Sequence, residues 1–148
     1  MKKIIYIVIS TIIVLLLVMF ILMNINNADT ESFEEKLIRY CKNNSKIQLT
    51  EITDFEWDKA YLDYDSYQGG EAIKEKHGIT GSLQKIRSDY LFRIAFSKDG
   101  KITEDIILNM FYIEFDESIE VITPKTLFTV NWVQLDDDNQ MLSLVENK

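Results

Sequence analysis

Aromatic and acidic side chains alternate in one short segment of the chain, Asp54-Phe55-Glu56-Trp57-Asp58-Lys59-Ala60-Tyr61. Side chains alternate between the two faces of a β-strand, so Phe55, Trp57 and Tyr61 are predicted to share one face. Glu56 and Asp58 then project from the other face about 7 Å apart, near the spacing of a glycosidase's acid and base. The three rings could form a platform on which a glycan stacks. These five residues are the candidate ligand-binding set.

Both halves of this set also have a structural interpretation. Burial of Trp57 would stabilise so small a domain by several kcal/mol, which favours the core for the rings. Paired acids such as Glu56 and Asp58 are common on the solvated face of a strand. We therefore favour a core role for the rings and assign no catalytic residue.

The chain has one Cys and one His, Cys41 and His77. A nucleophilic pair would require the two to meet in space, which their positions in the sequence do not show. Cys41 shares an apolar helical stripe with Leu37, which predicts a buried, inert thiol; an exposed thiol outside the cell would instead allow an intermolecular disulfide. His77 precedes Gly78 at a predicted helix end, where a cation interacts favourably with the helix dipole.

An acidic run, Asp136-Asp137-Asp138-Asn139, lies near the C-terminus. A calcium loop of the EF-hand type needs alternating acids, a central Gly and a distant Glu, and this run lacks that spacing. We therefore expect a solvated hairpin turn. One Cys and one His cannot build a Cys/His zinc site, and no common enzyme motif occurs. The sequence predicts no metal and no cofactor.

Hydrophobic periodicity predicts a small α+β domain over residues 31–148. Helical spacing runs from Thr30 or Ser32 to Lys42, and a second short helix covers 71–77. Period-two patterns predict strands over residues 47–52, 55–62, 90–96, 101–115, 127–135 and 141–145. Hairpin turns are expected at Asp99-Gly100 and at the acidic run. These elements predict an antiparallel sheet of about five to six strands with one or two covering helices.

The pattern Phe-x-Trp-Asp-Lys-x-Tyr at 55–61 resembles a strand motif of small uncharacterised envelope proteins and lipoproteins of low-GC Gram-positive bacteria. The resemblance continues through His77-Gly78-Ile79 and the Ile122-Thr123-Pro124-Lys125 step, roughly from Thr50 to Trp132. Those proteins usually have a Pro-Tyr pair after the strand, where this chain has Leu62-Asp63-Tyr64-Asp65. The resemblance implies an envelope protein and brings no established activity.

The segment Ile4 to Met23 is apolar except at Ser10 and Thr11, and it carries no charge. As a helix it would span roughly 30 Å, the thickness of a bilayer's hydrocarbon core. A cleaved secretory signal, the alternative, has a shorter apolar region and a small-x-small cleavage site. We therefore predict a cytoplasmic tip and transmembrane signal anchor over 1–23 and a juxtamembrane spacer over 24–30.

Lys2 and Lys3 precede this segment, and Lys36 is the first basic residue after it. The positive-inside bias predicts a single-pass plasma-membrane protein with its N-terminus in the cytoplasm and its C-terminal domain outside. The chain has 24 Asp+Glu against 16 Lys+Arg, a formal net charge of -8. Nucleic acid is excluded as a partner, since its binding needs a basic surface. The expected partners are the lipid bilayer, through Ile4 to Met23, and an envelope protein; the oligomeric state is left open.

The sequence thus favours a membrane-anchored, extracytoplasmic domain that acts as a non-enzymatic binding or interaction module at the bacterial cell envelope. One alternative is an envelope enzyme acting on wall glycan or peptide through Glu56, Asp58 or a Cys41–His77 pair. Another is a structural subunit of a membrane complex. A cleft lined by Trp57 and Tyr61 beside convergent acids would favour the enzyme, whereas buried rings would favour binding.

Overall fold

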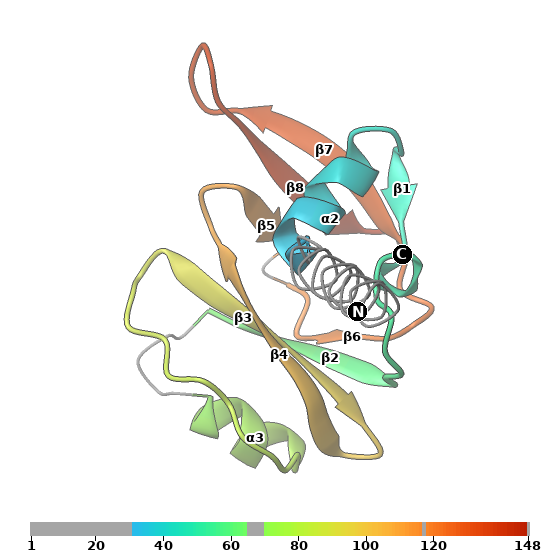
Figure 1. Ribbon diagram of the computed structural model, residues 1–148, viewed down its shortest axis with the longest axis vertical. Coiled ribbons are helices and arrows are strands. Elements are labelled where there is room, and N and C mark those ends of the chain that lie inside the picture. Colours follow the sequence, from blue (N-terminus) through green and yellow to red (C-terminus); the bar gives the residue numbers. More distant parts are fainter. Residues whose placement is uncertain (1–30, 65–69, 117, 148) are drawn as a thin grey trace, which may run out of the picture. The chain divides into compact units, whose positions relative to one another are not determined.

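Two four-stranded β-sheets dominate the described chain, which comprises residues 31–64, 70–116 and 118–147 of a computed structural model (Figure 1). From Ser32 onward the chain forms one compact unit. Sheet A has the strand order β1-β7-β8-β5, and sheet B has the order β4-β3-β2-β6. The elements in chain order are α2 (Phe33–Cys41), β1 (Lys46–Ile47), the 3₁₀ turn η1 (Leu49–Glu51), β2 (Lys59–Asp63), α3 (Glu71–His77), β3 (Leu91–Lys98), β4 (Lys101–Asn109), β5 (Ile113–Phe115), β6 (Val121–Ile122), β7 (Phe128–Gln134) and β8 (Gln140–Glu146).

Sheet B is built around β3, which pairs antiparallel with both β2 and β4. The β3–β4 hairpin turns at Asp99 and Gly100, whose φ angles are 51° and 74°. Both values are left-handed, as a two-residue turn of this kind requires, and Asp-Gly is a favoured pair for it. This hairpin is confirmed at the predicted residues. The prediction succeeded because the two turn residues themselves determine the turn.

The return strand predicted over 101–115 is instead two strands in two different sheets. β4 ends at Asn109, whose Oδ1 accepts the Phe111 N–H at 2.9 Å while its carbonyl accepts the Tyr112 N–H at 3.0 Å. The chain turns there, and β5 joins sheet A parallel to β8. The prediction of a single antiparallel sheet is therefore wrong, since a side-chain-stabilised turn sends this strand into a second sheet.

Two predicted strands are also shorter than their sequence pattern. In the first, the Glu51 carboxylate accepts the Gln48 N–H at 2.7 Å and closes η1, so only Lys46–Ile47 remain extended. Such local side-chain-to-backbone bonds compete with the pairing of strands. In the second, residues 55–58 precede β2, which begins at Lys59.

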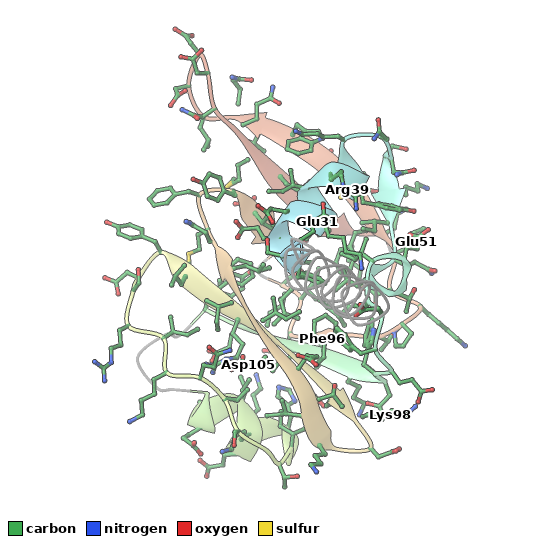
Figure 2. The ribbon with its side chains drawn as sticks, viewed as in Figure 1. Glu31, Arg39, Glu51, Phe96, Lys98 and Asp105 are labelled. Carbon is green, nitrogen blue, oxygen red and sulfur yellow. The ribbon has the colours of Figure 1, made fainter. Side chains whose placement is uncertain are left out.

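The main hydrophobic cluster joins α2 to one face of each sheet. Phe96 of β3, labelled in Figure 2, is fully buried in it. The rings of Phe33, Phe55 and Trp57 each meet Phe96 edge to face, with ring centroids 5.9, 5.0 and 5.1 Å away. Edge-to-face contacts of this kind stabilise a core beyond the area that they bury.

A smaller cluster lies on the opposite face of sheet B, under α3. It holds Tyr61, Ile73, Ile79 and Ala95. α3 occupies the predicted residues and ends at Gly78, whose φ of 63° is a left-handed value that favours glycine. Sheet B is therefore covered on both faces.

The predicted α+β fold with a leading transmembrane helix is wrong for the described chain. That chain is mostly sheet, with eight strands and two α-helices of nine and seven residues. No helix within the described ranges is long and apolar enough to cross a membrane. This finding corrects the predictions of a signal anchor, a single-pass membrane protein and a plasma-membrane location. Their source, Ile4 to Met23, and the spacer over 24–30 lie outside the described residues.

Candidate functional site

The rings of the predicted platform do not share a face. Trp57 is 6% exposed, donates its Nε1–H to Thr53 Oγ1 at 3.0 Å and packs on Phe96 in the main cluster. Tyr61 is 3% exposed and lies on the other face of sheet B, with its ring 4.5 Å from that of His77. The segment does not continue as a strand through Asp58, so the predicted alternation starts only at Lys59.

The remaining members of the predicted set have separate surroundings. Phe55 is half-buried against Phe96, and Glu56 is exposed. Asp58 faces the β3–β4 hairpin, where its Oδ2 accepts the Asp99 N–H at 2.9 Å and its Oδ1 accepts the Ser97 hydroxyl at 3.4 Å. Asp58 thus anchors a turn.

Cys41 and His77 lie on opposite faces of sheet B, Cys41 in the main cluster and His77 against Tyr61 of the smaller one. Cys41 is 1% exposed in the main cluster, and burial raises the pKa of its thiol to about 12, with the Glu51 carboxylate adding to the rise. His77 is the last residue of α3 and its ring packs against Tyr61, and its pKa is lowered by burial and then by the neighbouring Lys76 ammonium. The structure therefore does not bring the predicted nucleophile and base together.

Arg93 forms a buried ionic network on the α3 side of sheet B. It is 0% exposed; its Nε donates to Asp105 Oδ1 at 2.7 Å and its Nη1 to Asp63 Oδ2 at 3.4 Å. Its Nη2 donates to the Gln84 carbonyl, and the Gln84 N–H donates to Asp105 Oδ2 at 2.5 Å. Asp105, labelled in Figure 2, thus ties β4 to the segment before β3. Since each arm of the guanidinium is bonded within the protein, the network is structural.

An open cleft of about 440 Å³ lies between α2 and the β7–β8 hairpin. Figure 1 shows this hairpin, in orange and red, extending past the short strands of sheet A, with α2 beside it. Three segments far apart in the sequence line the cleft: α2, the turn after β4, and the hairpin with its tip. The lining residues are Ile38, Lys42, Tyr112, Trp132, Gln134, Asp137, Asp138 and Gln140.

Two aromatic rings in this lining are exposed to solvent. Trp132 of β7 is 36% exposed, and Tyr112 is 52% exposed. Trp132 pairs with Leu142 across the hairpin, and the Leu142 N–H donates to the Tyr112 carbonyl at 2.8 Å. Both rings are therefore carried by backbone that is hydrogen-bonded to β8, so the cleft has a fixed wall.

The acidic hairpin tip is organised by one of its own carboxylates. Asp136 Oδ1 accepts the Asp138 and Asn139 N–H groups at 3.0 and 2.9 Å, and the Asn139 side-chain amide donates to both Asp136 oxygens. These hydrogen bonds lower the pKa of Asp136, and the bond from the Asn139 side-chain amide contributes most to the lowering. The tip is the predicted hairpin turn, and across the described residues no group of three or more His, Cys, Asp or Glu could hold a metal ion.

The polar groups of the cleft differ in how far they are already bonded. Gln134 donates its amide to the Asp136 carbonyl and accepts the Gln140 amide at 2.7 Å. By contrast, the side-chain charges of Lys42, Asp137 and Asp138 form no hydrogen bond or ion pair with the part of the chain that the structure describes. The cleft therefore combines exposed rings with charges that are open to a ligand.

The cleft could not be predicted from the sequence pattern. The acidic turn and a strand through Trp132 were predicted, but nothing in the sequence places Lys42 or Tyr112 beside them. The only local pattern that could have pointed to the cleft was a Trp close to the end of a hairpin strand, followed by a run of acids. Comparison with protein-family models, with characterised proteins and with solved structures finds no match to this chain, so the resemblance to Gram-positive envelope proteins stays a prediction and the cleft is the basis for inferring function.

Proposed function

We propose that this protein is a non-enzymatic binding module and that its ligand occupies the cleft between α2 and the β7–β8 hairpin. The observation that carries the proposal is the exposure of Trp132 and Tyr112 in a hollow that also holds three charges without partners among the described residues. Ligand sites commonly combine aromatic walls with a few polar groups that set orientation.

The exposed Trp132 supports binding because a ligand would cover it. Most large apolar side chains of β7 and β8 on this face are buried, including Phe128, Leu142 and Leu144. Trp132 keeps 36% of its surface in water, and covering apolar surface is favourable by about 25 cal/mol per Å². A ligand lying on the indole would gain that free energy.

The fixed geometry of the hairpin tip supports binding as well. Asp136 holds the turn through the N–H groups of Asp138 and Asn139, so the neighbouring carboxylates are carried on a defined backbone. A ligand then meets groups that lose little conformational freedom when it binds.

The groups that would serve an enzyme are placed elsewhere. Asp58 anchors the β3–β4 turn, Cys41 is buried with a raised pKa, and His77 packs against Tyr61 at the end of α3. None of these residues lines the cleft. Their positions support binding over hydrolysis at this site.

The proposal can be tested by ¹⁹F NMR of the full-length chain labelled with 5-fluorotryptophan. The chain has two tryptophans, so Trp132 reports on the cleft, Trp57 reports on the core, and Trp132→Phe assigns the two resonances. Short peptides, neutral oligosaccharides and amino-acid amides are titrated separately. We expect at least one class to shift the Trp132 resonance, leave that of Trp57 in place and be recovered chemically unchanged. Failure of every class to move Trp132, or conversion of a bound probe, contradicts the proposal.

A further inference from the structure

We infer that the ligand of the cleft is an extended cationic peptide segment, with an arginine or lysine side chain lying on Trp132 and its charge directed toward Asp137 and Asp138. This inference rests on the proposed function. It is drawn from which groups of the cleft are already bonded and which are not.

The side-chain amide of Gln134 in the cleft is already hydrogen-bonded. A site that reads neutral hydroxyl groups would keep its amides available, but Gln134 uses its amide nitrogen on the Asp136 carbonyl and its amide oxygen on Gln140. The charges of Lys42, Asp137 and Asp138 lack partners among the described residues, as do the Tyr112 hydroxyl, the Trp132 indole N–H and the Gln140 amide oxygen. A charged ligand satisfies the three charges better than a neutral sugar does.

The charges of the cleft favour a positively charged ligand. Two carboxylates and one ammonium leave these three cleft residues with a formal charge of -1, and the Asp136 carboxylate organises the same tip. The whole chain carries a formal charge of -8. Complementary charge speeds association and sets orientation, so the field of this protein favours a cation.

The exposed ring of Trp132 also favours a cation. An arginine or lysine placed over the face of a Trp gains a cation–π interaction, which is strongest with Trp among the aromatic residues. Trp132 and the two acids belong to the same hairpin, whereas Lys42 is the C-cap residue of the facing helix α2. Repulsion by Lys42 directs the ligand's cation to the hairpin side, and the Lys42 ammonium can donate to carbonyl groups of the peptide backbone.

The test compares probes that differ in charge and little in shape. The full-length, 5-fluorotryptophan-labelled chain is titrated with acetyl-Gly-Arg-Gly-Arg-Gly-amide, with the same peptide carrying citrulline for arginine, and with cellotetraose. We expect the arginine peptide to shift the Trp132 resonance and to bind about tenfold more tightly than the citrulline peptide, a difference that shrinks as salt is raised. Equal affinities for the two peptides would overturn the inference.

Variants locate the charge effect. Asp137→Asn with Asp138→Asn should weaken binding of the arginine peptide about tenfold, since both charge partners are removed. Asp54→Asn with Glu75→Gln changes the net charge equally at exposed positions outside the cleft, and should stay within about twofold of the unmodified chain. An unchanged Trp57 resonance shows that each variant is folded. If both double variants bind the arginine peptide equally weakly, the effect comes from net charge alone, and Asp137 and Asp138 are not its binding partners.

The two levels of the proposal fail differently. If cellotetraose or the citrulline peptide shifts Trp132 and the arginine peptide does not, the cleft is a ligand site of another chemistry and only this inference is lost. If no probe of any class moves Trp132, the proposed function is lost with it.

Discussion

Trp132 and Leu142 pair directly across the β7–β8 ladder, yet Leu142 is fully buried and Trp132 is 36% exposed. Directly paired residues lie on the same face of a sheet, so the difference comes from what covers each of them. Leu142 belongs to the cluster that includes Leu37 and Cys41 of α2, whereas Trp132 lies in the cleft beside the same helix. One cross-strand pair therefore marks the border between core and candidate site.

Because of this border, truncating Leu142 should mainly reduce stability, whereas truncating Trp132 should mainly reduce binding. Leu142→Ala should lower the free energy of unfolding by about 3 kcal/mol, since it removes a fully buried side chain from the core. Trp132→Ala should lower it by about 1 kcal/mol, because the ring keeps much of its exposure in the folded chain, but should remove ligand binding. Chemical denaturation followed by circular dichroism measures the first effect. A larger stability loss for Trp132→Ala than for Leu142→Ala would make Trp132 a core residue.

Among the charged residues of the described chain, Arg93 is predicted to be the one whose substitution costs the most stability. Arg93→Met takes away the guanidinium that lies against the buried Asp63 and Asp105 carboxylates, and should cost about 3 to 5 kcal/mol of stability. The matched control is Arg87→Met at an exposed position, which should change stability by no more than about 0.5 kcal/mol. Comparable denaturation midpoints for the two variants would show that the network contributes little.

Asp58 and Glu56, once paired as candidate acids, should behave differently. Asp58→Ala removes the acceptor of the Asp99 N–H and should destabilise the chain by about 1 to 2 kcal/mol through the β3–β4 turn. Glu56→Ala changes an exposed side chain and should be close to neutral. Hydrogen exchange at the Asp99 amide should quicken in the first variant alone. Unchanged exchange in Asp58→Ala would refute its role as the anchor of the turn.

Cys41 should be unreactive in the native chain. With its pKa raised to about 12 from 9.0, its thiolate is about a thousandfold scarcer at pH 8 than that of an unperturbed thiol. Reaction with a disulfide reagent should therefore be at least about a hundredfold slower before unfolding than after it. Equal rates in native and denatured chains would place the thiol at the surface.

The same raised pKa predicts a loss of stability in alkali. The folded chain favours the neutral thiol, so its contribution is complete below the unfolded pKa of about 9 and is lost as pH rises toward 12. The gap in unfolding free energy between the unmodified chain and Cys41→Ala should therefore narrow above pH 9. Tyr and Lys titrate in both chains, so the comparison isolates the effect of Cys41. If the difference in unfolding free energy does not change with pH, the raised pKa of Cys41 is contradicted.

Features with a local cause could be predicted from the sequence. The Asp99-Gly100 turn, the end of α3 at Gly78 and the turn over Asp136–Asn139 stand where their residues indicate. Each depends on a conformation or a hydrogen bond that residues within a few positions provide. The net negative charge of the chain is likewise a property of its composition.

The sheet arrangement and the cleft were decided by contacts between distant residues. A turn at Asn109 divides the expected strand between two sheets, and β5 then pairs with β8 near the other end of the chain. Trp57 precedes β2, which starts at Lys59, so the alternation of the strand does not extend to it, and Trp57 and Tyr61 lie on opposite faces of sheet B. Lys42 and Trp132 line one hollow only after α2 packs beside the β7–β8 hairpin. Hydrophobic periodicity specifies which side chains are buried, but it does not specify their partners, and the candidate site depends on those partners.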